Sequence, residues 1–423
     1  MRAEEKPGDA RRGKGVIPWL EVKLALAMKQ VSSGATAHQV EFLPFHVPSI
    51  GDEEIAEVVA TLRSGWLTTG QRAHQLEQDF AAALGAAHAL AVSSGTAALH
   101  LALRAAGVGP GDEAIVPTFT FTATAEAVLY CGARPVLADV DPASGNLVPA
   151  EVERRLGART RAVVPVHVGG LPCALDEIVA VAHARGVPVV DDAAHALPAR
   201  VGGRPVGTLA DATAFSFYAT KNLTTGEGGM VTTAHDAWAD AMRVWRLHGI
   251  SRDAWKRYTA EGTWAYEVLD VGCKYNLPDV LAAIGIAQLR KLDGFAARRR
   301  TLVERYRAGL ADLDTVALPE EPAGVESAWH LFVVRLAVER LRIDRARVIE
   351  ELRALGIGTS VHFIPLHLQP YYRRTLGTRP GDFPGAEDLF RRCISLPLHP
   401  ALGESDVDRV VEALRDVLAR QRR

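Results

Sequence analysis

Three short polar segments follow predicted strands, at positions where a hydrophobic core alone would not need polar side chains. They are SSGT at 93–96, DDAAH at 191–195 and SFYATK at 216–221. Lys221, at the end of the third segment, could form an imine with an aldehyde if burial lowered its pKa, and could then move a proton between two carbon atoms. A lone lysine is usually a solvated surface residue, so the chemical interpretation of Lys221 depends on the residues around it.

Asp192 and His195 are the chemically distinctive residues of the second segment. Asp192 follows the apolar run 187–190, where a buried carboxylate is costly unless it meets a cationic partner. A protonated pyridine ring is such a partner, and the pairing would make the ring an electron sink for a carbanion. An aspartate at a strand end is also a common helix cap or turn former. His195 could hold Asp192 or a phenolic oxygen of a cofactor, or it could be a structural histidine, and the sequence leaves these alternatives open.

The first segment, SSGT, lies between the strand-like run HALAV and a strongly helical run. The free backbone N–H groups and the positive end of such a helix suit a phosphate. Thr96 could instead only cap the helix, and the motif alone does not separate the two interpretations. Near the third segment, Ser216 and the loop TTGEGG at 224–229 place a hydroxyl group and a closely approaching backbone beside Lys221.

The elements that must position these segments are predicted to form a mostly parallel sheet. From residue 88 to residue 233, short β-branched runs alternate with helical runs, which is typical of βαβ units. Ligands bind at the carboxyl ends of such strands, so we expect the three segments to meet there. After about residue 292 the pattern changes to a long charged helix, a strand and two further helices. We therefore predict an extension at 1–40, a large α/β domain at 41–295 and a smaller α+β domain at 296–423.

Composition excludes several classes of protein. The 423 residues include 48 Lys and Arg against 50 Asp and Glu, so no global charge attracts nucleic acid or anionic lipid. The longest apolar runs, such as 280–287, are far shorter than the roughly 20 residues of a membrane helix.

Glu21 and Lys23 interrupt the apolar part of the N-terminal segment, which argues against a secretory signal and predicts a cytoplasmic protein. The four cysteines form no C-x-x-C pair, so neither a disulfide framework nor a metal site is expected. Residues 1–40 are expected to be flexible.

The long run at 191–233, from DDAAHALPAR to GEGGMVTT, resembles the core of the pyridoxal-phosphate (PLP) dependent nucleotide-sugar aminotransferases of the DegT/StrS family. Further similar segments occur in the family's order: SGWLTTG (64–70), SSGTAALHLAL (93–103), KYNLPDVLAAIGIAQLRKL (274–292), AWHLFVVRL (328–336) and GIGTSVHFIPLHLQPYY (356–372). The resemblance extends from about residue 42 to the end. It implies the type I fold of PLP-dependent transferases, like that of aspartate aminotransferase, and a homodimer with shared active sites.

The resemblance also implies roles for individual residues. Lys221 matches the lysine that binds PLP covalently, Asp192 the partner of the pyridine nitrogen, and His195 a position where members carry His or Gln. Asn276 matches a residue that reaches the phosphate in the other subunit. Gly95, Thr96, Ala97 and Ser216 match residues that contact the phosphate. Phe121 matches an aromatic side chain that stacks on the ring, for which a buried core residue is the alternative. Thr69 and His362 match residues on the substrate side.

The implied reaction is transfer of an amino group from L-glutamate to a nucleotide-linked keto sugar. His195 and the likeness to UDP-4-amino-4-deoxy-L-arabinose-type enzymes favour amination of a 4-keto-6-deoxyhexose on dTDP or UDP, with a 3-keto sugar as the alternative. A PLP-dependent sugar dehydratase would need a histidine in place of Lys221, and a non-catalytic regulatory relative should lack Lys221 or Asp192. The glycine cluster at 107–111 follows a helix and precedes a strand, the reverse of a dinucleotide-binding motif. His362 and His367 could also be structural residues.

Overall fold

The computed structural model describes residues 41–251 and 266–423. The predicted flexible extension at 1–40 lies outside the described residues. The central sheet brings the three polar segments to one edge. Four strands pair in the order β1-β9-β8-β5, and their bounds are His88–Val92, Gly229–Thr233, Ala212–Ser216 and Val190–Asp192. β5 and β8 are parallel, whereas β9 is antiparallel to both of its neighbours.

A second group of parallel strands continues this sheet. Its order is β3-β2-β4, with bounds Arg134–Ala138, Glu113–Pro117 and Thr160–Val163. Isolated parallel bridges join Val163 to Val189 and Val166 to Asp192, so the chain at and just after β4 runs beside β5. The carboxyl ends of β5 and β8 therefore share an edge with the loops that follow β2 and β4, as the sequence pattern predicts.

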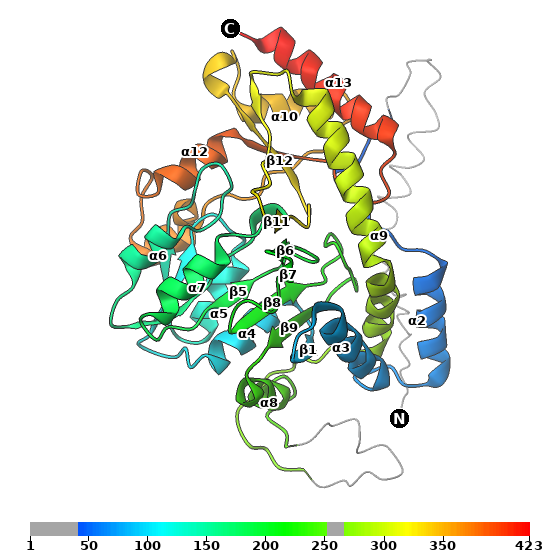
Figure 1. Cartoon of the computed structure of the whole chain (residues 1–423), viewed down its shortest axis with the longest axis vertical. Coiled ribbons are helices and arrows are strands. Elements are labelled where there is room, and N and C mark those ends of the chain that lie inside the picture. The colour runs from blue at the N-terminus through cyan, green and yellow to red at the C-terminus, as the bar shows by residue number, and fades with distance from the viewer. Residues whose placement is uncertain (1–40, 252–265) are drawn as a thin grey trace, which may run out of the picture. The chain divides into compact units, whose positions relative to one another are not determined.

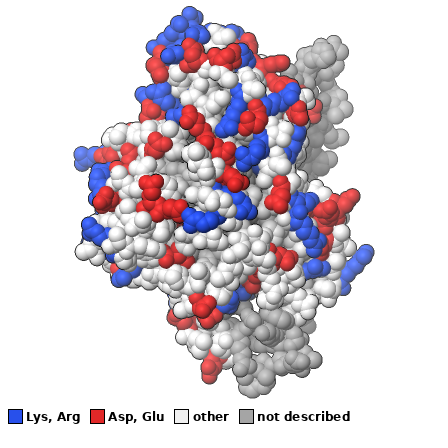
Figure 2. Space-filling view, viewed as in Figure 1, with Lys and Arg blue, Asp and Glu red and all other residues white. Residues whose placement is uncertain are grey.

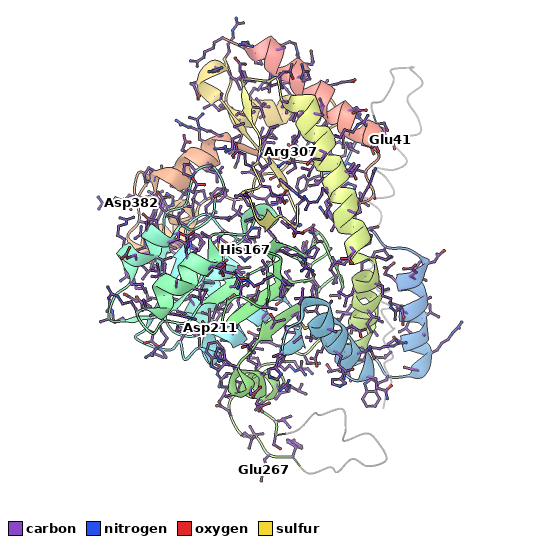
Figure 3. All side chains as sticks on the ribbon, viewed as in Figure 1. Glu41, His167, Asp211, Glu267, Arg307 and Asp382 are labelled. Carbon is purple, nitrogen blue, oxygen red and sulfur yellow. The ribbon has the colours of Figure 1, made fainter. Side chains whose placement is uncertain are left out.

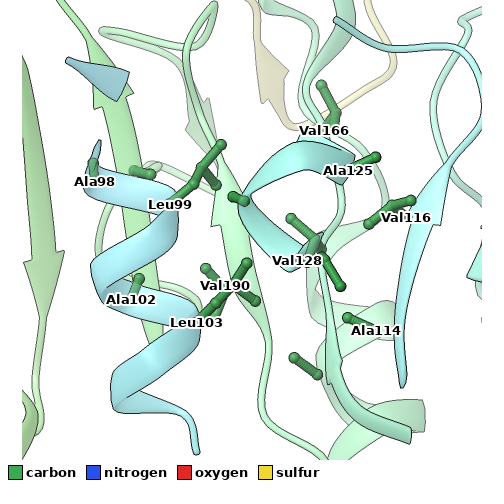
Figure 4. Close-up of a cluster of buried hydrophobic side chains, with 14 of the residues drawn as sticks. Ala98, Leu99, Ala102, Leu103, Ala114, Val116, Ala125, Val128, Val166 and Val190 are labelled. Carbon is green, nitrogen blue, oxygen red and sulfur yellow. The ribbon is translucent and has the colours of Figure 1, made fainter. Parts of the chain in front are cut away.

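Helices lie around the sheet (Figure 1). The helices of this part of the chain are α2 (Asp52–Ser64), α3 (Gln71–Leu84), α4 (Gly95–Ala105), α5 (Ala123–Tyr130), α6 (Pro149–Arg155), α7 (Leu175–His183) and α8 (Asp236–Trp245). One apolar cluster joins α4 and α5 to the strands, with Leu103 and Val190 among its fully buried members (Figure 4). Burying a leucine of this kind contributes roughly 1.5–3 kcal/mol, so this cluster anchors the start of α4 against the sheet.

A second apolar cluster lies in the C-terminal part of the chain. Its elements include α10 (Arg345–Ala354), α13 (Glu404–Gln421), β10 (Val316–Ala317), β12 (Phe332–Leu336) and β13 (Cys393–Leu396). The buried residues of α11 (Pro370–Leu376) and α12 (Pro384–Arg392) pack in the first cluster instead. A small sheet of β11 (Val325–Glu326), β6 (Arg200–Val201) and β7 (Arg204–Pro205) connects the two parts. The 32-residue helix α9, Asp279–Leu310, packs on α2 and α3 and also on α13. The predicted boundary at 295 falls inside this helix and stays a prediction.

The visible surface mixes both signs of charge, with Lys and Arg next to Asp and Glu over most elements (Figure 2). This distribution agrees with the small formal net charge of -2. Among the described helices, none has both the length and the apolar character that crossing a membrane would require.

Candidate active site

Lys221 and Asp192 follow neighbouring parallel strands. Asp192 ends β5 and is paired in register with Ala214 of β8, and Lys221 comes five residues after β8 ends. The backbone N–H of Lys221 donates to the carbonyl oxygen of Tyr218 at 2.9 Å, which closes a tight turn at the strand end. Burial lowers the pKa of Lys221 to about 8, and the Asp192 carboxylate opposes this change. Near neutral pH this amine therefore gives up its proton far more readily than a surface lysine.

Asp192 is held by two donors. Its Oδ2 accepts a hydrogen bond from the Thr124 hydroxyl at 2.8 Å, and its Oδ1 accepts one from the backbone N–H of Ala194 at 3.2 Å. Burial raises the pKa of this carboxyl, and the bonds from Thr124 and Ala194 act in the other direction. A buried carboxylate in this position suits a cationic partner. Sequence reasoning missed Thr124, although the threonine-rich run PTFTFTAT was a visible signal.

His195 is buried beside the same strand end. Its Nδ1 accepts a hydrogen bond from the backbone N–H of Gly169 at 3.3 Å, and its ring centre lies 4.4 Å from that of His330. The ring also stacks on Phe363, with 5.8 Å between ring centres. Burial, followed by the charge of Lys221, lowers the pKa of His195 well below its usual value. The ring is therefore neutral and carries its proton on Nε2.

The start of α4 lies against Ser216. A Cβ atom added at Gly95 would come within 2.9 Å of the Ser216 Cβ, so the glycine permits this close approach. Ser94 caps the helix, because its hydroxyl oxygen accepts from the backbone N–H of Ala97 at 3.0 Å. The alternative that Thr96 serves as the cap is therefore wrong. The structure brings Gly95, Thr96 and Ala97 together with Ser216. The N–H group of Ala97 is bonded to Ser94, and those of Gly95 and Thr96, at the positive end of the helix, suit an anion.

Phe121 is not a core residue. Its side chain is 60% exposed, and its ring centre lies 6.2 Å from that of Phe363. It lies on the loop between β2 and α5, one turn before the Thr124 that holds Asp192. An exposed flat ring near a buried carboxylate can cover one face of an aromatic ligand.

Asn276 and Thr69 lie beside the end of β1, where Asn276 forms an antiparallel bridge with Val92. The Asn276 amide donates to the Thr69 hydroxyl at 2.6 Å, and that hydroxyl donates to the Leu277 carbonyl oxygen at 2.7 Å. Both residues line a cavity of about 480 Å³ whose lining does not include Lys221 or Asp192. Its other charged lining residues are Arg243, Arg246 and Lys274, against Glu77, and His74, His88 and His248 also line it.

The two histidines of VHFIPLH have different surroundings. His367 is fully buried, with Nδ1 2.8 Å from the Thr118 hydroxyl and Nε2 2.9 Å from Glu387, so it is a structural residue. His362 instead lines a second cavity of about 240 Å³, and its Nδ1 lies 2.9 Å from the Ser395 hydroxyl. Burial and then the charge of Lys221 lower the pKa of His362 to about 4.

A buried lysine with a lowered pKa, an opposing buried carboxylate and an anion-accepting helix end on one sheet edge define an aminotransferase-type site. Residues 48–415 match the DegT/DnrJ/EryC1/StrS aminotransferase family, and the chain belongs to that family. The spore coat polysaccharide biosynthesis protein SpsC of Bacillus subtilis is 47% identical over 378 residues, which cover 89% of this chain and 97% of SpsC.

Solved structures agree with this assignment. The putative sugar aminotransferase Spr1654 of Streptococcus pneumoniae, in its PLP form, superposes with a TM-score of 0.84 at 33% identity, covering 90% of this chain and 99% of that one. A PMP form of the same protein has also been solved. The aminotransferase TlmJ of Streptoalloteichus hindustanus gives a TM-score of 0.82 at 38% identity, with 90% and 99% coverage. The predicted type I fold and the predicted enzyme class, a sugar aminotransferase, are confirmed.

Proposed function

We propose that this protein uses PLP to transfer the amino group of L-glutamate to a nucleotide-linked keto sugar. The observation that carries the proposal is the pair of Lys221 and Asp192, two buried groups with shifted pKa values at adjacent strand ends. A 4-keto-6-deoxyhexose on dTDP or UDP is the proposed acceptor, and a 3-keto sugar is the second candidate. We propose that the protein acts in the cytoplasm and that it needs neither a nucleic acid nor a membrane as a partner.

The described residues fit each part of PLP. Lys221 supplies an amine for the aldehyde, and Asp192 can keep a proton on the pyridine nitrogen. The N–H groups of Gly95 and Thr96 and the Ser216 hydroxyl suit the phosphate, and the glycine at 95 lets Ser216 lie directly against the start of α4. His195 can donate its Nε2 proton to the phenolic oxygen, and Phe121 can cover the ring. When bound, PLP would supply an electron sink, and the amine of Lys221 would take up and return the proton that the transfer moves.

We propose that Thr69 and Asn276 complete the active site of a second copy of the chain. In support, they line a mainly basic cavity that Lys221 of the same chain does not reach, and basic groups suit phosphates. Large apolar side chains are also exposed near this cavity and near Lys221. Exposed apolar side chains of this size favour a second protein surface that covers them. They are Phe121, Tyr130, Tyr218, Val268, Leu269 and Val271.

We propose that His362 contacts the sugar. The lining of the cavity of about 240 Å³ on which His362 lies does not include Lys221 or Asp192 either, so this cavity would take a part of the sugar nucleotide away from the reacting carbon. Glycine 169 and Phe119 line the same cavity, which offers both backbone polar groups and an apolar wall. His362 is neutral at physiological pH, so it can donate or accept a hydrogen bond without a charge.

The proposal is tested by incubating the protein with PLP, ¹⁵N-labelled L-glutamate and a panel of 4-keto and 3-keto sugars on dTDP and UDP. Mass spectrometry should find the ¹⁵N label in one sugar nucleotide, and Lys221→Ala should abolish the transfer. A product that has lost water and gained no ¹⁵N would support the dehydratase instead. Label in no sugar nucleotide of the panel, while the protein binds PLP, would contradict the proposed acceptor class.

A further inference from the structure

A fully buried histidine, His167, lies behind the strand end that carries Asp192 (Figure 3). Its Nε2 lies 2.9 Å from Oδ2 of Asp191, and the backbone N–H of Cys173 donates to its Nδ1 at 3.0 Å. Because Nδ1 accepts that hydrogen bond, the ring proton is on Nε2 and is donated to Asp191. His167 thus joins its own loop to the carboxylate that precedes Asp192.

The two carboxylates of β5 point to opposite faces of the strand, as successive strand residues do. Asp192 meets Thr124 on one face, and Asp191 meets His167 on the other. The other oxygen of Asp191, Oδ1, is buried and has no hydrogen-bond partner among the described residues. A buried carboxylate with a single side-chain donor depends strongly on that donor.

The segment that carries His167 also contacts His195. The backbone N–H of His167 donates to the Asp192 carbonyl oxygen at 3.4 Å. The turn η1, Val168–Gly170, follows directly, and the N–H of Gly169 donates to Nδ1 of His195 at 3.3 Å. One segment of four residues therefore contacts the backbone of Asp192 and the ring of His195.

We propose that His167 is a positioning residue: by holding Asp191, it fixes the end of β5 and the turn at 168–170, and so aligns Asp192 and His195 beside Lys221. The inference rests on the proposed function only where it says that Asp192 and His195 face PLP. Catalytic groups must be held to within a fraction of an ångström, which requires supporting residues of this kind. The two consecutive aspartates then have different roles: Asp191 holds the strand end in place, and Asp192 faces the cofactor.

Three variants separate this role from general stability. His167→Leu removes the donor to Asp191, whereas His167→Gln keeps an N–H group of similar reach. His183→Leu is the matched control, because it removes a His–Asp contact of 2.8 Å, that of His183 with Asp211, at the surface. Figure 3 labels both His167 and Asp211, which lie apart. Three properties are measured on the full chain: the ¹⁵N resonances of the His195 ring without cofactor, the affinity for PLP, and the pH midpoint of the bound-PLP absorbance.

His167→Leu should move the His195 resonances, weaken PLP binding about tenfold through loss of a charged hydrogen bond, and shift the absorbance midpoint. His167→Gln should recover most of the affinity, and the control should change nothing. A folded His167→Leu protein with wild-type values for all three properties would overturn the proposal.

Two further outcomes remain decisive. If His167→Leu does not fold, Asp191→Ala replaces it, since this variant removes the acceptor that His167 holds. It should move the His195 resonances, and unmoved resonances in the folded variant would overturn the proposal. If the wild-type protein does not bind PLP, the proposed function fails, while the His195 resonances of the cofactor-free His167→Leu protein still test the positioning role.

Discussion

Burying Lys221 should cost the protein stability that a single substitution can restore. Its pKa is lowered from 10.5 to about 8 by burial. The difference, 10.5 − 8, is about 2.5 pH units, which corresponds to about 3 kcal/mol lost by the charged lysine on folding. Lys221→Met removes the charge and keeps a side chain of similar length. We expect this variant to stabilise the cofactor-free protein by up to about 3 kcal/mol near pH 7.

The gain should depend on pH in a defined direction. Below pH 8 the lysine is protonated in both the folded and the unfolded chain, so its full cost is present. As the pH rises from 8 to 10.5, the folded chain loses the proton first and the cost falls. At pH 10 the gain from Lys221→Met should therefore have dropped to about 1 kcal/mol or less.

Urea unfolding of the cofactor-free protein, followed by circular dichroism at pH 7 and pH 10, measures both values. Lys274→Met is the matched control, because Lys274 is exposed, and a surface change of this kind should stay within about 0.5 kcal/mol. Two results would refute the reasoning: a Lys221→Met protein no more stable than wild type at pH 7, or a gain that is as large at pH 10 as at pH 7.

Further predictions concern the site and the core. Borohydride reduction in the presence of PLP should fix the cofactor mass on the Lys221 peptide, and modification of another lysine would contradict the assignment. Mixed Lys221→Ala and Asn276→Ala chains should regain activity above the Asn276→Ala parent, and no gain in verified heterodimers would count against a shared site. His362→Ala should slow reaction of the keto sugar far more than reaction of glutamate, as measured by cofactor absorbance in each half-reaction; equal losses would remove His362 from the sugar site. Leu103→Ala should lower the free energy of unfolding by about 2–5 kcal/mol, because Leu103 is fully buried, and a loss below about 1 kcal/mol would show that the cluster collapses around the gap.

Much of the site was predictable because parallel strands end at one edge of their sheet. That rule alone brings Asp192 and Ser216 together, and it places Lys221 near them. The contacts of Thr124 with Asp192 and of Gly169 with His195 were not predictable, because each joins elements whose relative position depends on side-chain packing. Packing also separates His362 from His367, five residues apart, in a way that their common motif does not indicate.

Two other features could not be predicted from one sequence, for different reasons. Asn276 and Lys221 do not line one cavity within a chain, so the resemblance alone suggested that they act together across two copies. The second apolar cluster was expected from the change of pattern after residue 292. Its connection to the apolar cluster around α3 was not, because the pattern did not show that one helix continues unbroken from residue 279 to residue 310.

That helix limits how the length of the chain can change. At 1.5 Å per residue, its 32 residues extend about 48 Å, and its two halves pack on different apolar clusters. Each added residue turns everything after it by about 100° around the helix axis. One extra residue near Gly294 would therefore swing Leu302 and Tyr306 out of the second cluster while leaving Ala282 and Ile286 packed in the apolar cluster that includes Leu76 and Phe80 of α3. Between its two contact regions the helix acts as a fixed-length spacer, in which side chains can be exchanged but residues cannot be added or removed.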